Sequence, residues 1–159
     1  MSKSDVYLPT YEGCIVCGQP QVNPNTMNRR FKVTPQGVEV EFTPSFKQEG
    51  YKGIVHGGIV CSLLDETIGW AVAVDRKKYF MTGELNVRFV RPWPVGVAVV
   101  VKGWCVEHKS RYTIAEGEIV DKKGTVYAKA SGKFFLMKDD QARQGHQYLT
   151  FREGDLKIL

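Results

Sequence analysis

The most constraining feature of this chain is a long apolar stretch with helical spacing over residues 56–74. Apolar side chains recur on nearly every side of this predicted helix: Ile59, Val60, Leu63, Leu64, Ile68, Trp70, Val72 and Val74. A helix that is apolar all round is buried rather than placed on a surface. About eighteen residues at 1.5 Å each give roughly 27 Å of helix, enough for five or six strands to wrap. We therefore expect an α+β fold in which a curved antiparallel sheet encloses one long central helix.

Six segments around this helix have the composition and alternation of β-strands. Two precede the helix and four follow it, at residues 29–33, 37–43, 82–90, 95–107, 111–121 and 125–137. The turns between the last four, RPWPVG, EHKS and DKKG, predict that these strands form an antiparallel meander. The domain is expected to occupy residues 29–137, after an irregular segment with a CxxC turn (1–28) and before a polar tail (138–159) of unassigned structure.

Composition places limits on location and partners. The 159 residues suffice for one domain with a sizeable core, and the net charge of +5 suits an anionic ligand. The Lys and Arg residues are scattered rather than gathered in one tract, so nucleic acid is not an expected partner. The opening MSKSDVYLPT lacks the apolar core of a secretory signal, and no segment is expected to span a membrane. With only four cysteines and no disulfide framework, a cytoplasmic protein without a membrane partner is expected.

Two adjacent acids, Asp65 and Glu66, interrupt the apolar helix. Burying an unpaired carboxylate is expensive, and partial burial makes a carboxylate more basic. The two side chains differ by about 100° around the helix, so they cannot point at the same group. Asp65 shares its face with Ser62 and Gly69, which leave room for a substrate. This spacing favours Asp65 over Glu66 as the acid that faces a substrate, with Glu66 as a structural or supporting acid.

The helix begins at His56-Gly57-Gly58, where backbone N–H groups have no helical partner. Such donors stabilise a developing oxyanion, and glycines at 57 and 58 let a substrate approach the backbone closely. Gly57 and Asp65 are about 12 Å apart along one helix, too far to act on the same carbonyl carbon. The site is therefore expected to join Gly57 of one subunit to Asp65 of another. His56 is interpreted as a structural residue that fixes the loop, with a role as a base as the alternative.

The remaining candidates each have a plain alternative. Cys14 and Cys17 have zinc-knuckle spacing, but the sequence offers no second pair. Two subunits could pool their pairs, or the pair could simply form a packing turn; no metal is expected. Cys61 is interpreted as a small buried hydrophobe. The basic residues that could hold a phosphorylated ligand could equally be surface charges: Arg88, Arg91, Lys109, Arg111 and Lys133. The aromatic residues Trp93, Trp104, Tyr79 and Phe80 could line a pocket or fill the core.

Several motifs together resemble a known family. HGGIVCSLLDE, the preceding GYKGIV, the strand TGELNVRFVRPWPVG and the closing AKASGKFFLM resemble the PaaI-like branch of the hot-dog thioesterase superfamily, which includes 4-hydroxybenzoyl-CoA thioesterase. The resemblance covers roughly residues 28–137. It implies hydrolysis of acyl-CoA thioesters without a metal or redox cofactor. It also implies a homodimer or dimer of dimers with active sites at the interface.

The resemblance assigns roles to particular residues. The acid of the family falls on Asp65, as general base or nucleophile, its oxyanion-hole N–H on Gly57, and a water-holding hydroxyl on Thr82. Where some members carry Asn or Gln, this chain has Gly50, and Gln48 could substitute for that side chain. The alternative function is a non-catalytic acyl-CoA or lipid-binding module. The acyl group is not predicted.

Overall fold

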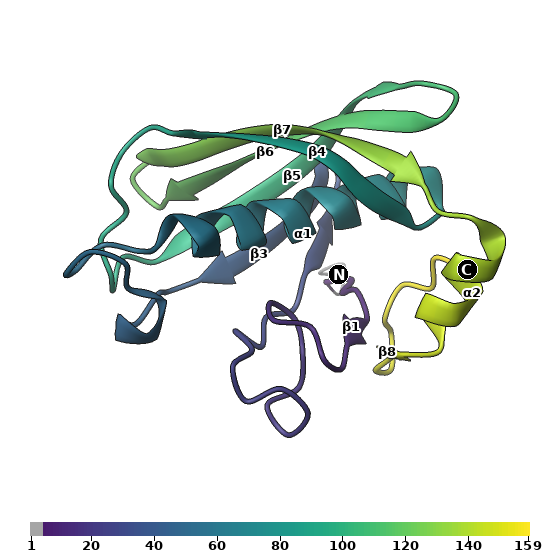
Figure 1. Cartoon of the computed structure of the whole chain (residues 1–159), viewed down its shortest axis with the longest axis horizontal. Coiled ribbons are helices and arrows are strands. Elements are labelled where there is room, and N and C mark those ends of the chain that lie inside the picture. The colour runs from purple at the N-terminus through teal and green to yellow at the C-terminus, as the bar shows by residue number, and fades with distance from the viewer. Residues whose placement is uncertain (1–4) are drawn as a thin grey trace.

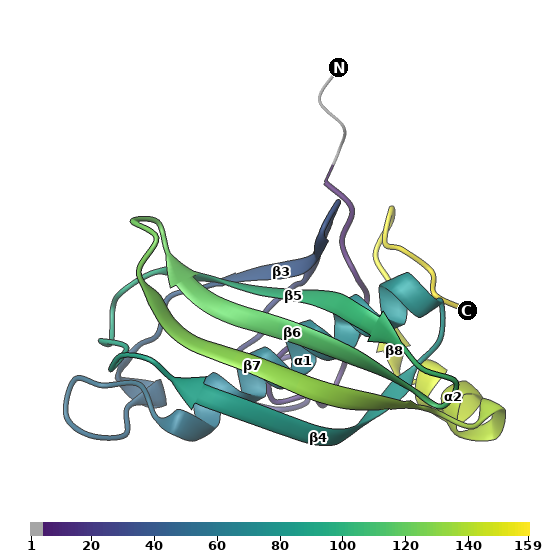
Figure 2. The same ribbon diagram turned by 90° about the horizontal axis from the view of Figure 1, so that it is seen from above.

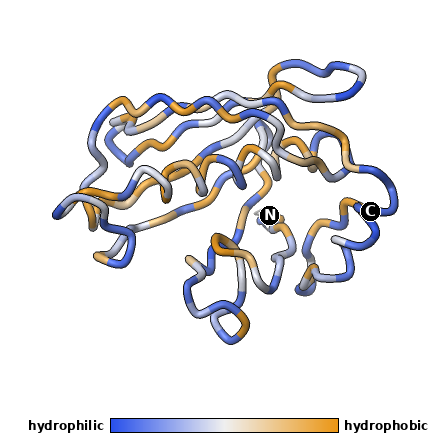
Figure 3. Tube along the Cα trace, in the orientation of Figure 1, coloured by the Kyte–Doolittle hydropathy of each residue, from blue (hydrophilic) through white to orange (hydrophobic). Residues whose placement is uncertain are grey.

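The computed structural model describes residues 5–159 and contains one long helix packed along a six-stranded antiparallel sheet (Figure 1). Helix α1 spans Gly57–Arg76. The strands of the sheet are β2 (Lys32–Thr34), β3 (Gly37–Phe42), β4 (Phe80–Phe89), β5 (Val99–His108), β6 (Tyr112–Asp121) and β7 (Val126–Leu136). Apolar residues run along α1 and alternate with polar ones along strands such as β3 (Figure 3). The predicted architecture of a central helix and a curved antiparallel sheet is confirmed.

The strand order corrects the predicted meander. Across the sheet the order is β2-β3-β5-β6-β7-β4, so β4 pairs with β7 at one edge and not with β5 (Figure 2). Of the four strands after α1, only β5, β6 and β7 follow one another as hairpins. The segment between β4 and β5 contains Pro92 and Pro94, which cannot donate ladder hydrogen bonds. It is instead held beside the loop before α1, where Val55 N donates to Trp93 O (2.9 Å).

Glycines allow α1 to lie close to the sheet. Gly103 on β5 and Gly117 on β6 are register partners. A Cβ at Gly103 would lie 2.8 Å from the carbonyl oxygen of Thr67, and one at Gly117 would lie 2.8 Å from Cγ1 of Ile68. Neither position has room for a side chain, so the helix packs directly against the backbone of the sheet. This contact leaves Leu63, Leu64, Ile68 and Val72 of α1 fully buried.

The side of α1 away from the sheet is only partly covered, which corrects the expectation of a helix enclosed all round. Gly58 is exposed, and Cys61, Ser62, Asp65 and Gly69 are half-buried. These five residues recur at helical spacing and form one face, which we call the open strip of α1. By length and hydropathy α1 meets the criteria for a membrane span, but half of its apolar window is buried inside the protein, as in a core helix.

Segments near the two ends of the chain meet on the side of α1 that faces away from the sheet (Figure 1). In the N-terminal segment β1 (Thr10–Tyr11) pairs with β8 (Leu149–Thr150), and α2 (Asp139–His146) precedes β8. A short 3-10 helix, η1 (Phe46–Gln48), lies in the loop before α1. The tail left unassigned from sequence is therefore a helix and a strand, and residues 1–4 of the predicted N-terminal segment lie outside the described residues.

Candidate active site

The start of α1 is capped by a histidine side chain. Nδ1 of His56 accepts a hydrogen bond from Gly58 N (2.9 Å), which places the ring proton on Nε2. The carbonyl of His56 accepts from Ile59 N (3.0 Å) and Val60 N (3.3 Å). Within residues 5–159 the Gly57 N–H has no acceptor. The cap thus satisfies the first turn except for one donor at the positive end of the helix.

Asp65 makes a direct contact with β4. Oγ1 of Thr82 donates to Oδ1 of Asp65 (2.7 Å), although the two residues come from different elements. A β-bulge between Thr82 and Glu84 shifts the register of β4 immediately after Thr82. The hydroxyl occupies one carboxylate oxygen and leaves Oδ2 available. Of the residues predicted for the site, Asp65 and Thr82 are therefore brought together.

A cavity of about 330 Å³ opens beside this pair. One wall is α1, with Asp65, Glu66, Gly69, Trp70 and Ala73. Tyr79, Phe80 and Thr82 form a second wall, and Tyr11, Cys14 and Met137 come from segments outside the core elements. Of the four aromatic candidates, Tyr79 and Phe80 lie here. No pattern in the sequence indicates Tyr11 or Met137, because only the folded arrangement brings the segments that carry them to α1.

Glu66 faces a different set of groups. Its Oε2 accepts from Cys14 Sγ (2.9 Å) and its Oε1 from Nε1 of Trp70 (3.4 Å). Burial, and next the adjacent Cys14 sulfur, raises the pKa of the Glu66 carboxyl to about 8. The two adjacent acids thus diverge, as their angular separation on the helix predicts. Asp65 is directed to β4 and Glu66 to the N-terminal segment.

In a single chain, Gly57 does not line the cavity that Asp65 lines. It lines one cavity of about 280 Å³ with Phe89, Arg91 and Trp93, and another of about 370 Å³ with Tyr51 and His56. Asp65 lines neither of these cavities. A single protomer therefore keeps the predicted oxyanion donor and the predicted acid apart.

The residues predicted to contact substrate are dispersed. Oε1 of the Gln48 side chain accepts a hydrogen bond from Ser45 N (2.8 Å). The backbone carbonyl of Gln48 accepts one from His56 N (2.8 Å). Nζ of Lys133 lies 3.1 Å from Oε2 of Glu84, and Nη1 of Arg91 donates to Val126 O (3.0 Å). Arg111 is exposed at the start of β6, where its carbonyl accepts from Leu136 N (3.1 Å). Of these residues, Arg91 is the one that lines a cavity with Gly57.

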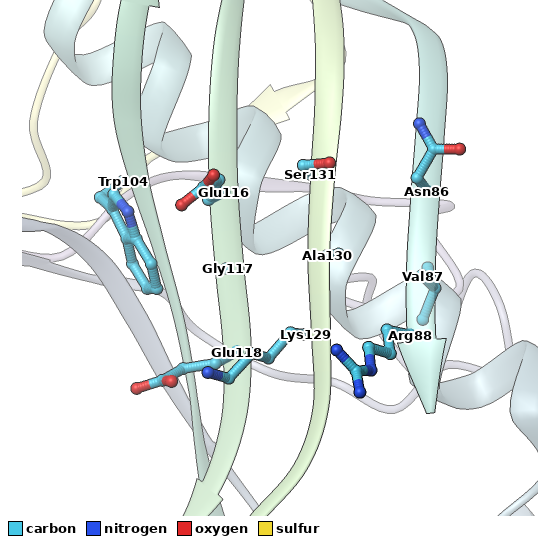
Figure 4. Close-up of a pocket in the computed structure, with 10 residues that line it drawn as sticks. All are labelled: Asn86, Val87, Arg88, Trp104, Glu116, Gly117, Glu118, Lys129, Ala130 and Ser131. Atoms are coloured by element: carbon cyan, nitrogen blue, oxygen red, sulfur yellow. The ribbon is translucent and has the colours of Figure 1, made fainter. Parts of the chain in front are cut away.

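Arg88 lies on the other face of the sheet. It lines a cavity of about 390 Å³ across β4, β5, β6 and β7, with α1 behind the sheet (Figure 4). Trp104, Glu118 and Lys129 surround the same hollow. Trp104 therefore belongs to this outer face and not to the Asp65 cavity. Trp93, the remaining aromatic candidate, is buried beside the Gly57 cavity.

The chain matches known proteins over this region. The family model of the thioesterase superfamily matches residues 52–128, which include Gly57, Asp65 and Thr82. A protein of Saccharolobus solfataricus named as an esterase is 30% identical over 102 residues, covering 64% of this chain and 71% of that protein. The chain belongs to the thioesterase superfamily. The resemblance predicted from the HGG and LLDE motifs is confirmed.

One further relative and one solved structure with the same fold are informative. Acyl-coenzyme A thioesterase THEM5 of Mus musculus is 32% identical over 105 residues, which cover 65% of this chain and 42% of that protein. This chain thus spans less than half the length of the mouse enzyme. The PaaI protein of Escherichia coli has the same fold, with a TM-score of 0.60 and 19% identity over 64% of this chain and 72% of that one. The PaaI-like hot-dog fold is therefore confirmed.

Proposed function

We propose that this thioesterase-superfamily chain hydrolyses acyl-CoA thioesters and that Asp65 activates the attacking water. The observation that carries the proposal is the Thr82–Asp65 hydrogen bond beside a partly apolar cavity. A carboxylate held in one orientation by a neighbouring hydroxyl can accept a proton reproducibly at its second oxygen. The name of the mouse relative, an acyl-coenzyme A thioesterase, supports the substrate class.

The proposed hydrolysis requires water and the Asp65 carboxylate, and it uses neither a metal nor a redox cofactor. Water attacks the thioester carbonyl while Asp65 takes one of its protons, and the carbonyl oxygen becomes an oxyanion. Backbone N–H donors stabilise that charge. When the intermediate collapses, the carbon–sulfur bond breaks and Asp65 returns the proton to the departing thiolate. The products are a free carboxylic acid and CoA.

The oxyanion donor is proposed to come from a second copy of the chain. The Gly57 N–H lacks an acceptor within the described residues, and Gly57 lies outside the Asp65 cavity. Strand β4 is a ten-residue edge strand whose side chains are mostly exposed, and such an edge is a template for pairing with another chain. A twofold dimer through β4 sets the two α1 helices antiparallel. Gly57 of one protomer can then approach Asp65 of its partner.

Contacts to CoA belong to the same proposal. Arg91 lines the cavity of Gly57, so it is the basic residue best placed to meet a phosphate at a shared site. Lys133 would first have to leave Glu84, and Gln48 would have to leave Ser45. Arg88 and Arg111 lie outside the cavities of Asp65 and Gly57. They can meet CoA only where its nucleotide end extends over the sheet or its rim.

The test compares the wild type with Asp65→Asn on a panel of acyl-CoA thioesters. Because the amide cannot accept the proton of water, kcat is expected to fall about a hundredfold or more while substrate still binds. Release of free CoA measures turnover, and calorimetry measures binding. Wild-type turnover in Asp65→Asn refutes the assignment of the base. Binding without turnover in the wild type would instead identify a non-catalytic acyl-CoA-binding module.

A further inference from the structure

The N-terminal cysteines and Glu66 form a compact group of ligand atoms. Cys14 Sγ, Cys17 Sγ and a Glu66 carboxylate oxygen all lie within 4.8 Å of one another. Cys14 and Glu66 are 52 positions apart in the chain, so only the folded arrangement makes them neighbours. The hydrolytic step proposed above uses none of the three. The cluster therefore needs an explanation of its own.

The turn that carries the two cysteines is built around their sulfur atoms. Val16 N (3.3 Å) and Cys17 N (3.4 Å) both donate to Cys14 Sγ, and Tyr11 N donates to Cys17 Sγ (3.4 Å). The two backbone N–H groups aimed at Cys14 Sγ stabilise negative charge on that sulfur, and a thiolate is the form of cysteine that binds metals.

Gly18 is required to close this turn. Its N–H donates to the carbonyl of Cys14 (2.9 Å), and a Cβ at this position would lie 2.2 Å from that oxygen. Any side chain at position 18 would therefore open the turn and separate the sulfurs. The segment Cys14-Ile-Val-Cys17-Gly18 thus fixes both cysteines on the side that faces α1, where Glu66 and Trp70 complete the surroundings.

We propose that Cys14, Cys17 and Glu66 form a zinc-binding site that fastens the N-terminal segment to α1 beside Asp65. Two thiolates and one carboxylate are the donors that zinc prefers, whereas magnesium and calcium prefer oxygen alone. Around a tetrahedral zinc such donor atoms lie about 3.5–3.8 Å apart, so the widest pair, within 4.8 Å, must close by roughly 1 Å, and Cys14 Sγ and Glu66 Oε2, now 2.9 Å apart, must open by less than about 1 Å. Because Cys14 and Glu66 also line the cavity, a water from that side can fill the fourth position.

This proposal replaces the need for a second cysteine pair. The knuckle spacing of Cys14 and Cys17 is completed by an acid from α1 of the same chain, so pooling of pairs between subunits is not required. Binding displaces the protons held by the cluster into solvent and leaves the three ligands with a net charge of −3. Zinc reduces that charge to −1, and Nε1–H of Trp70 donates to the remaining carboxylate oxygen. The metal has no part in the proposed attack on the thioester.

The test uses the full chain, reduced and stripped with a chelator, and titrates it with cobalt as a probe for zinc. One cobalt per chain is expected, with sulfur-to-cobalt charge-transfer absorption and the visible bands of a tetrahedral ion. Cys14→Ser and Cys17→Ser should each weaken binding about tenfold or more. Glu66→Gln should weaken it similarly but keep the charge-transfer band. Cys61→Ser, a control at another half-buried cysteine, should bind as the wild type does.

A second measurement on the wild type guards against variants that fail to fold. With zinc bound, Cys14 and Cys17 should resist alkylation while Cys61 reacts, and removal of zinc should expose Cys14. The proposal is overturned if the reduced wild type takes up no more cobalt than the Cys14→Ser/Cys17→Ser double variant. It is equally overturned if Cys61→Ser abolishes uptake. Metal content is measured without any thioester, so this result and the hydrolysis assay can fail independently.

Discussion

At the residue scale, the contact between Thr82 and Asp65 determines what the acid can do. The hydroxyl donates to one carboxylate oxygen over 2.7 Å, while Gly69, one turn further along α1, leaves space beside the acid. Thr82 touches the acid and is proposed to act through it, so it is a positioning residue. A hydrogen bond to a charged carboxylate is shorter and stronger than one between neutral groups, so it favours one orientation of the Asp65 side chain.

The positioning role predicts a separation of kcat from KM. Thr82→Val keeps the shape of the side chain but removes the donor, so kcat is expected to fall about ten- to hundredfold with little change in KM. Thr82→Ser keeps the hydroxyl and should restore most of the turnover. Steady-state kinetics on the preferred thioester measure both parameters. If Val and Ser at this position behave alike, the hydroxyl does not position the acid.

Local sequence predicts the direction in which a helical side chain points better than it predicts which residue that side chain contacts. The angular separation of Asp65 and Glu66 follows from helix geometry, and the structure directs them to β4 and to Cys14 respectively. The pairing of Glu66 with Cys14 was not predicted, because no local pattern connects residues that lie 52 positions apart. The zinc-knuckle spacing was visible, but its third ligand was not.

At the element scale, hydrophobic periodicity predicts the long helix and the strands of the main sheet but not the pairing of those strands. The strand predicted at 82–90 is β4 (Phe80–Phe89), and the helix predicted at 56–74 is α1 (Gly57–Arg76). Alternation along β4 gives no information on its neighbour, and β4 in fact pairs with β7. The tail was unassigned because α2 is short and polar, with Ala142 as its single buried residue.

The N-terminus of α1 provides an element-scale prediction. Gly57 is the first residue of the helix, where proline is well tolerated, and His56 already has an extended conformation (φ −62°, ψ 137°) that suits a residue before proline. Gly57→Pro therefore removes the proposed oxyanion donor while keeping the helix. Turnover is expected to fall about a hundred- to thousandfold.

The matched control for this change is Gly57→Ala. Its Cβ would lie 3.4 Å from the ring of Phe89, an ordinary contact, and its N–H is retained. Turnover near that of the wild type is expected in Gly57→Ala, with circular dichroism and melting curves unchanged in both variants. If the Gly57→Pro enzyme is active, a group other than the Gly57 N–H must form the oxyanion hole.

At the scale of the whole molecule, the composite site predicts complementation between two inactive variants. Within one chain Gly57 and Asp65 open into different cavities, so the proposed site needs Gly57 of one protomer and Asp65 of its partner. A mixed dimer of Asp65→Asn and Gly57→Pro chains would contain one site with both groups intact and one with neither. Coexpression in equal amounts should therefore restore about a quarter of the wild-type specific activity, because half of the dimers are mixed.

This result distinguishes a shared site from a site within one chain, and it holds equally for a dimer or a dimer of dimers. If each chain carried its own complete site, every protomer in the mixture would retain one lesion and activity would stay at the level of the single variants. The control coexpresses Asp65→Asn with the Asp65→Asn/Gly57→Pro double variant, where no arrangement of protomers supplies an intact acid. Recovery of activity in the first mixture alone, with light scattering giving an even number of chains, would establish that catalysis requires the assembly of two chains.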